Sequence, residues 1–164
     1  MRDDSHKWDE PQDLSAPLTG PGVTVRRIAP DRQTLISAPD ILARTPGAIG
    51  WPDQAGGDSY SLCLRRDRVL EINGPARADG WDGQQAVSDV TDGLAIFEIT
   101  GPRAVDLVKR GAEISDALPS RSAVREAFGL EVILYRWHQA LRLHVARTQA
   151  QTLRKLLAEH LALM

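Results

Sequence analysis

The chain has 164 residues, a formal net charge of −2 and a pI of about 6.1. That length fits one domain, or one domain with a tail, and is enough for a hydrophobic core without metals or disulfides. The charge gives no electrostatic reason to expect a nucleic acid or an anionic membrane as a partner. The single cysteine, Cys63, excludes an internal disulfide and a multi-cysteine metal site, and we expect a cytoplasmic location.

The N-terminal half predicts an arm followed by short strands. Residues 1–22 are rich in Asp, Pro, Ser and Gly, and predict an arm that is flexible or becomes ordered on a partner. Residues 23–164 are expected to form one domain, beginning with a strand at Val23–Ile28. A short helix is predicted within Ala38–Arg44. A hairpin is predicted to join Tyr60–Leu64 to Val69–Ile72.

The segment from Ala86 to Gly111, AVSDVTDGLAIFEITGPRAVDLVKRG, combines strand, turn and helix signals. Two strands are expected on either side of the Thr91-Asp92-Gly93 turn, because Asp-Gly supplies the positive φ angles of a tight hairpin. A helix then begins, with Gly101 as its N-cap and Pro102 at its first position, where the missing N–H costs nothing. Gly111 is expected to end that helix in a left-handed conformation.

The C-terminal part predicts a strand at Ser122–Ala127, a hairpin and a final helix. The hairpin joins Leu130–Trp137 to Leu141–Ala146, and the second strand alternates so that one face is buried and the other, with His144, faces solvent. A capping box opens the final helix, formed by Thr148 and Gln151, and a stripe of leucines follows it. Together these elements predict an α+β fold in which helices cover one face of an antiparallel sheet of hairpins.

No residue pattern indicates a catalytic, cofactor-binding or metal site. Asp89 and Asp92 could act as an acid and a base beside a pocket, but Asp is also a preferred turn residue, and we favour that interpretation. Cys63 has no identifiable base or oxyanion site, so a packed thiol is expected. No pair of histidines has zinc-ligand spacing, and no glycine-rich phosphate-binding loop is present.

Three tryptophans fall in the expected arm and loops: Trp8, Trp51 and Trp81. Tryptophan is enriched at interface hot spots, so these side chains are candidates for a partner interface. The alternative is that the loops fold over the domain and bury them.

The segment VSDVTDGLAIFEITGPRAVDLVKRG resembles the gamma subunit of heterotetrameric sarcosine oxidase. More distantly, it resembles the folate-binding domains of the glycine-cleavage aminomethyltransferase family. The resemblance rests on the turn with Asp89, Asp92 and Gly93, the apolar strand after it, and the Gly101-Pro102 helix start. The C-terminal stretch from Val124 to Leu161 fits the same subunit.

The resemblance implies a non-catalytic structural subunit of a flavoenzyme complex that demethylates sarcosine to glycine and passes the one-carbon unit to tetrahydrofolate. It implies no cofactor in this chain, with FAD, FMN, NAD and tetrahydrofolate held by partner subunits. The implied partners are the alpha and beta subunits, with a delta subunit as a further candidate. One alternative is a stand-alone small folate-binding protein in which Asp89 or Asp92 faces the pterin. Another is an enzyme that uses Asp89 or Cys63.

Overall fold

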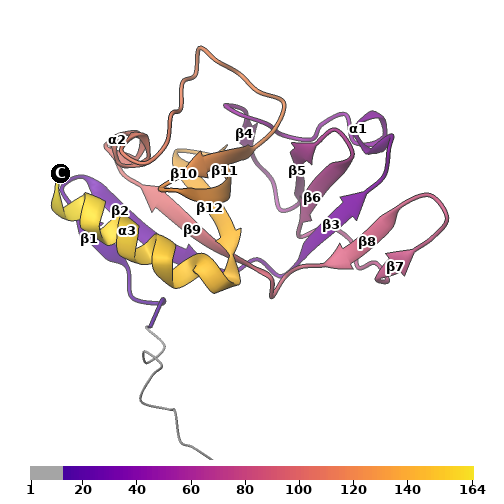
Figure 1. The fold of residues 1–164 in the computed structure, drawn as a ribbon, viewed down its shortest axis with the longest axis horizontal. Coiled ribbons are helices and arrows are strands. Elements are labelled where there is room, and N and C mark those ends of the chain that lie inside the picture. The colour runs from indigo at the N-terminus through magenta and orange to yellow at the C-terminus, as the bar shows by residue number, and fades with distance from the viewer. Residues whose placement is uncertain (1–12) are drawn as a thin grey trace, which may run out of the picture.

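The computed structural model describes residues 13–164, whose strands form a seven-stranded and a five-stranded sheet (Figure 1). The first, called sheet A, has the order β1 (Leu18–Gly20), β2 (Val23–Ile28), β9 (Leu94–Thr100), β12 (Ala140–Ala146), β11 (Leu130–Trp137) and β10 (Val124–Ala127), and β4 (Gln54–Ala55) pairs with β11 in parallel. The second, called sheet B, has the order β5 (Tyr60–Arg65), β6 (Arg68–Ile72), β3 (Gln33–Ser37), β8 (Ala86–Asp89) and β7 (Gly80–Trp81).

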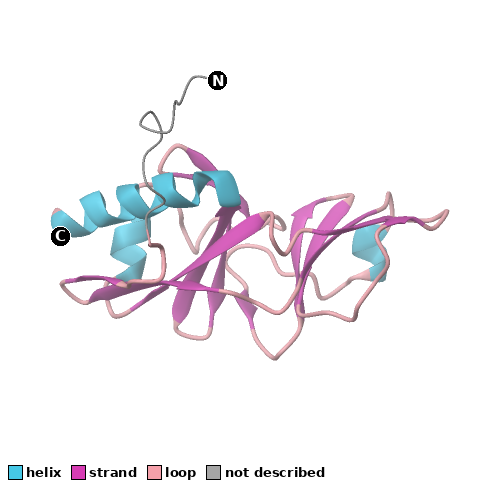
Figure 2. Ribbon diagram, turned by 90° about the horizontal axis from the view of Figure 1, so that it is seen from below, coloured by secondary structure: helices cyan, strands magenta, loops and turns pink. Residues whose placement is uncertain are grey.

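The helices lie outside the two sheets, so the chain forms layers (Figure 2). α2 (Ala104–Lys109) and α3 (Ala150–Ala162) pack on one face of sheet A, and a single 3-10 turn (Arg147–Gln149) precedes α3. The opposite face of sheet A packs against sheet B through a shared apolar cluster that includes Leu62, Leu70 and Ile133. α1 (Ile41–Arg44) covers the outer face of sheet B.

Several strand predictions are confirmed. The strand Val23–Ile28 has the predicted bounds, and the hairpins β5–β6 and β11–β12 form as expected. The α+β class, with antiparallel strands and few helices, is also confirmed. The difference is that the hairpins divide between two sheets. Sheet B covers part of the face of β12 that was expected to meet solvent. His144 therefore has no exposed surface and Arg142 is half-buried, whereas Ala146 stays exposed.

The predicted hairpin around Asp92 and Gly93 is wrong, because β8 and β9 belong to different sheets. β8 pairs with β3 and β7, whereas β9 pairs with β2 and β12, so neither strand has an edge free for the other. The turn between them carries the chain across the interface. Gln33 anchors this crossover: its backbone N–H donates to Thr91 Oγ1 at 2.9 Å, and its side-chain amide donates to the carbonyls of Thr91 and Leu94.

The predicted start of α2 is displaced: the helix begins at Ala104, and no side-chain cap precedes it. Gly101 instead adopts a φ of +110°, and a Cβ at this position would lie 2.3 Å from the carbonyl oxygen of Gly22. Gly111 follows the C-cap residue Arg110 and does not adopt a left-handed conformation; a Cβ there would lie 2.1 Å from the Phe128 ring. Both glycines are therefore required by close packing, and Gly101 also by its backbone angle.

The two chain ends differ in detail from the predictions. The segment expected to be an arm contributes β1, which pairs with β2, and Leu14 and Leu18 pack against the core beneath the helices. Residues 1–12, the rest of the expected arm, lie outside the described residues. At α3, neither the 3-10 turn nor the helix has a side-chain cap, so the predicted capping box does not form.

Candidate functional site

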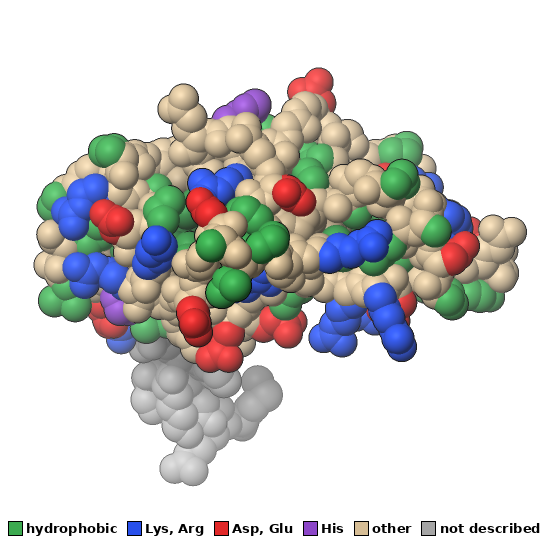
Figure 3. All heavy atoms as spheres, turned by 90° about the horizontal axis from the view of Figure 1, so that it is seen from above, with side chains coloured by type: hydrophobic (Ala, Val, Ile, Leu, Met, Phe, Trp, Pro, Cys, Tyr) green, Lys and Arg blue, Asp and Glu red, His purple; other side chains and the backbone are tan. Residues whose placement is uncertain are grey.

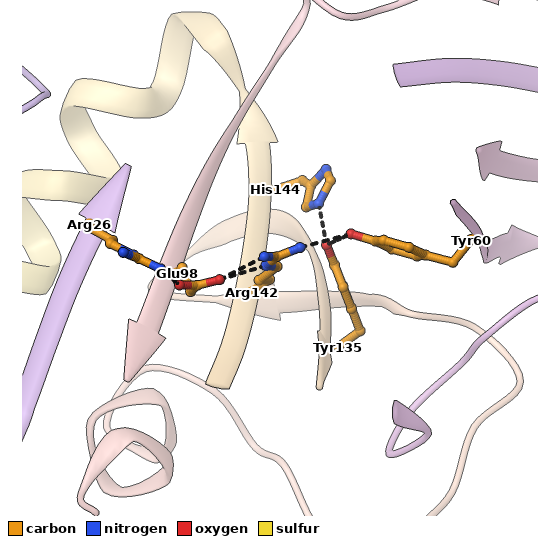
Figure 4. A network of polar contacts seen from close by, with 6 residues as sticks. All are labelled: Arg26, Tyr60, Glu98, Tyr135, Arg142 and His144. Atoms are coloured by element: carbon orange, nitrogen blue, oxygen red, sulfur yellow. Dashed lines mark hydrogen bonds and ion pairs between the residues drawn. The ribbon is translucent and has the colours of Figure 1, made fainter. Parts of the chain in front are cut away.

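A polar network of six residues lies between the two sheets (Figure 4). Arg142 and His144 come from β12, Glu98 from β9 and Tyr135 from β11. They project from the face of sheet A that meets sheet B. Arg26 of β2 and Tyr60 of β5 complete the network. Glu98 is 3% exposed and His144 is 0% exposed, so these polar groups depend on one another for hydrogen bonds.

Glu98 is held between two arginines. Its Oε1 accepts from Nε of Arg26 at 2.9 Å, and its Oε2 accepts from Nε and Nη2 of Arg142 at 2.9 and 2.7 Å. Burial raises the pKa of the Glu98 carboxyl, but the hydrogen bonds and charges of both arginines outweigh burial and hold that pKa below its usual value. Glu98 is therefore a carboxylate that balances the charge of Arg142, whose side chain is 14% exposed.

A chain of hydroxyl contacts continues from Arg142. Its Nη1 donates to the Tyr60 hydroxyl at 3.1 Å, the Tyr60 and Tyr135 hydroxyls lie 2.7 Å apart, and the Tyr135 hydroxyl lies 2.9 Å from Nε2 of His144. Burial raises the pKa of Tyr135. Burial, followed by the positive charge of Arg142, lowers the pKa of His144 to about 3. At neutral pH both rings are therefore uncharged.

Arg142 fixes the direction of these hydrogen bonds. A guanidinium only donates, so the Tyr60 oxygen accepts from Arg142 and its proton is directed to Tyr135. Tyr135 then donates to Nε2 of His144, which leaves the histidine proton on Nδ1. Nδ1 of His144 has no partner in either direction, but the reverse direction would also leave the Tyr60 proton without one. On this ground we assign His144 as the Nδ1–H tautomer, whose buried Nδ1 has no hydrogen-bond partner.

The network is better suited to joining the two sheets than to proton transfer. A histidine with a pKa of about 3 is a weak general base near neutral pH. Through Arg142 and Tyr60 the network connects the central strands of sheet A to β5 of sheet B. The Arg142 guanidinium also lies 4.0 Å from the centre of the Trp137 ring, which adds a cation–π contact.

The aspartates singled out in the sequence do not form an acid–base pair. Asp89 Oδ1 accepts from the backbone N–H of Thr91 at 2.8 Å, and hydrogen bonds from Thr91 lower the pKa of Asp89. Asp92 has a side chain that is 97% exposed and pairs with Arg147. Asp89 thus ends β8 and bonds within the crossover turn, and Asp92 lies in that turn, which is the interpretation favoured from the sequence.

The tryptophans proposed as a partner interface have different surroundings. Trp51 is 2% exposed and donates from Nε1 to the Ser115 carbonyl at 3.0 Å. Its loop folds over the domain, so Trp51 is not available on the surface of the described chain. Trp81 is 64% exposed on β7, the edge strand of sheet B, and stays a candidate for a partner contact. Trp8 lies outside the described residues.

Cys63 is buried, and burial raises the pKa of its thiol. Among residues 13–164, no cluster of three or more His, Cys, Asp and Glu side chains could hold a metal ion. None of the helices in this part of the chain is long and apolar enough to span a membrane. Basic and acidic side chains both occur on the face shown in Figure 3, with acidic ones gathered along its lower edge and basic ones at the lower right.

The buried network was not identified from the sequence, although one signal was present. Glu98 is the single charged residue in an otherwise apolar strand, LAIFEIT. An acid in such a strand is buried only when it is paired, so it predicts basic partners on the neighbouring strands. Arg26 and Arg142 are those partners, directly opposite Glu98 in the registers of β2 and β12.

No protein-family model and no curated protein matches this chain. Among solved structures, the chain is similar to one from the heterotetrameric sarcosine oxidase of Corynebacterium sp. U-96, determined in complex with pyrrole 2-carboxylate. The TM-score is 0.67 and the sequence identity is 17%, over 91% of this chain and 89% of that chain. The two chains share a fold along nearly their whole lengths.

Proposed function

We propose that this protein is a non-catalytic, gamma-type subunit of a sarcosine-oxidase-type complex. The observation that carries the proposal is the structural likeness to a chain of heterotetrameric sarcosine oxidase, because it extends over 91% of one chain and 89% of the other. A shared domain inside otherwise different proteins would leave much of one chain unmatched. The segment Ala86–Gly111 independently resembles the gamma subunit of that enzyme.

The surface of sheet B offers a place for the partner contact. Trp81 is 64% exposed, and its strand β7 pairs on one side only, with β8. A large exposed aromatic side chain on a sheet edge is typical of a hot spot in a protein interface. We place the alpha and beta subunits there as candidate partners, with FAD, FMN, NAD and tetrahydrofolate bound by the partner subunits and the complex in the cytoplasm.

Affinity purification of the full-length protein from its own cells tests this proposal. The expected result is a complex with a flavin absorption spectrum that oxidises sarcosine and whose other subunits are identified by mass spectrometry. The variant W81A should lose partner subunits, whereas L118A, which truncates another exposed side chain, should retain them. A stable monomer that captures no flavoprotein would refute the proposal.

Calorimetric titration with tetrahydrofolate distinguishes the alternative of a stand-alone folate-binding protein. That alternative placed Asp89 or Asp92 against the pterin, but Asp89 accepts from Thr91 in the crossover turn and Asp92 pairs with Arg147. We therefore expect no heat of binding from the isolated chain, and saturable binding by a folded monomer would favour the alternative.

A further inference from the structure

A cleft of about 310 Å³ opens between the two sheets beside His144. Its walls are mostly apolar, with Leu64 and Leu70 from sheet B and Val124 and Ile133 from sheet A among them. The volume and the apolar lining are typical of sites for small organic molecules. The cleft is separate from Trp81 and from the partner contact proposed above, since β7 contributes nothing to it.

Two buried nitrogen atoms that lack hydrogen-bond partners belong to residues that line this cleft: Nδ1 of His144 and Nε of Arg68. Figure 4 shows His144 with one ring nitrogen toward Tyr135 and the other turned away from the network. A buried donor without a partner is unfavourable, and native proteins contain few of them. A group bound in this cleft would give both atoms a partner.

Both unpartnered atoms are donors, which defines the chemistry of a group that would pair with them. The direction of the hydroxyl chain leaves the proton of His144 on Nδ1, and the Nε of a guanidinium always donates. A ligand must therefore bring acceptors. Arg65 adds a second positive charge at the rim, while Glu131 is the one acidic residue among those that line the cleft. The positive charges and the two donors favour an anionic acceptor, of which a carboxylate matches the guanidinium geometry best.

We infer that this cleft binds a small organic carboxylate with an apolar body. The carboxylate accepts from Arg68, an acceptor of the ligand reaches Nδ1–H of His144, and the body lies among the leucine and valine side chains. Neither nitrogen contacts solvent, so the ligand must lie against the cleft floor and displace the side chains that cover these atoms. The inference does not depend on the proposed subunit role.

Isothermal titration calorimetry of the purified full-length protein, in whichever assembly it is isolated, tests this inference with three probes of one size. Phenylacetate carries the carboxylate, phenylacetamide is its neutral counterpart, and phenethylamine is a cation that would favour Glu131 instead. We expect saturable binding of phenylacetate and affinity at least about tenfold lower for the amide and the amine, because hydrogen bonds to a charged acceptor are the stronger ones.

Three variants assign the binding to this cleft. R68Q removes the guanidinium and should weaken phenylacetate binding about tenfold or more. V124F fills the cleft with a larger side chain and should weaken it without removing a polar group. R66Q changes an exposed arginine of the same β5–β6 turn that does not line the cleft, so it should bind as the unmodified protein does.

Any of three results would overturn the inference. The first is the absence of saturable heat with phenylacetate up to about 10 mM, a concentration that would reveal even weak binding. The second is equal affinity for the amide or the amine. The third is undiminished binding by R68Q and V124F. Failure to recover a flavoprotein complex, by contrast, would refute the proposed function and leave the binding result intact.

Discussion

Replacing Glu98 with glutamine tests whether the buried ion pair holds the sheet interface together. E98Q keeps the size of the side chain but removes its charge, and one of its two oxygen acceptors becomes an NH2 donor. That donor must face a guanidinium. We expect it to face Arg26, because the Arg26 side chain is 60% exposed and can bond to water, whereas that of Arg142 is 14% exposed.

The magnitude follows from the bonds to Arg142. Two hydrogen bonds from Arg142 lose their charged acceptor, and each is weakened by about 1–2 kcal/mol. Breaking a buried pair outright costs about 3–5 kcal/mol. We therefore expect E98Q to lower the free energy of unfolding by about 2–4 kcal/mol. R26Q, the matched control at the exposed end, should cost about 1 kcal/mol or less.

Urea denaturation followed by tryptophan fluorescence measures both variants. The pH dependence gives a second check. Because the folded-state pKa of Glu98 lies below its ordinary value of 4.5, its contribution is present above pH 4.5 and is lost as the pH falls through the folded-state pKa. The difference between the unmodified protein and E98Q should thus narrow in acid. A loss of less than about 1 kcal/mol at pH 7, or one no larger than that of R26Q, would refute this reasoning.

Three further predictions concern the interior. Y135F should cost about 1–3 kcal/mol in urea denaturation, because it removes the acceptor for the Tyr60 proton and the donor to Nε2 of His144. An unchanged midpoint would contradict the hydroxyl chain. His144 should lower the stability of the protein in acid, since its pKa is about 3 when folded and 6.5 when unfolded. Its contribution to the free energy of unfolding is complete above pH 6.5 and declines below that pH by up to about 1.4 kcal/mol per pH unit. The variant H144Q should lack this slope. G111A should lower the free energy of unfolding by about 1–3 kcal/mol, because its Cβ would meet the Phe128 ring. G47A has open space around its Cβ and should change that free energy by no more than about 0.5 kcal/mol, as measured by thermal denaturation. Equal effects of the two variants would contradict the packing argument.

The sequence predicted local structure well where a side-chain period was clear. The strands of β11–β12 and of β5–β6 follow from short apolar runs bounded by turn residues, and the stripe of leucines places α3. These signals depend only on neighbouring residues, so they persist whatever surrounds the element. The positions of Gly101 and Gly111 could not be interpreted in the same way, because what they require is close contact with Gly22 and Phe128 from distant parts of the chain.

The site could not be predicted because alternation in β12 shows that two faces differ, but not what covers each face. Arg142 and His144 looked like solvent-facing residues, and only the presence of sheet B reverses that interpretation. The same limit applied to the turn at Asp92 and Gly93, which is equally suitable for a hairpin and for a crossover between sheets. Glu98 was the one residue whose type alone conflicted with its apolar neighbours.

The path of the chain between the sheets has a consequence for how the protein unfolds. The chain passes from one sheet to the other between β2 and β3, between β3 and β4, between β4 and β5, and again at the crossover held by Gln33. Neither sheet is a continuous stretch of sequence. Neither can therefore be isolated as a fragment of the chain or unfold while the other stays folded. Folding must wait for partners distant in sequence, as in β2–β9 and β3–β8, which makes it slow and cooperative. Because of the contacts at this interface, the two sheets are expected to fold and unfold as one cooperative unit.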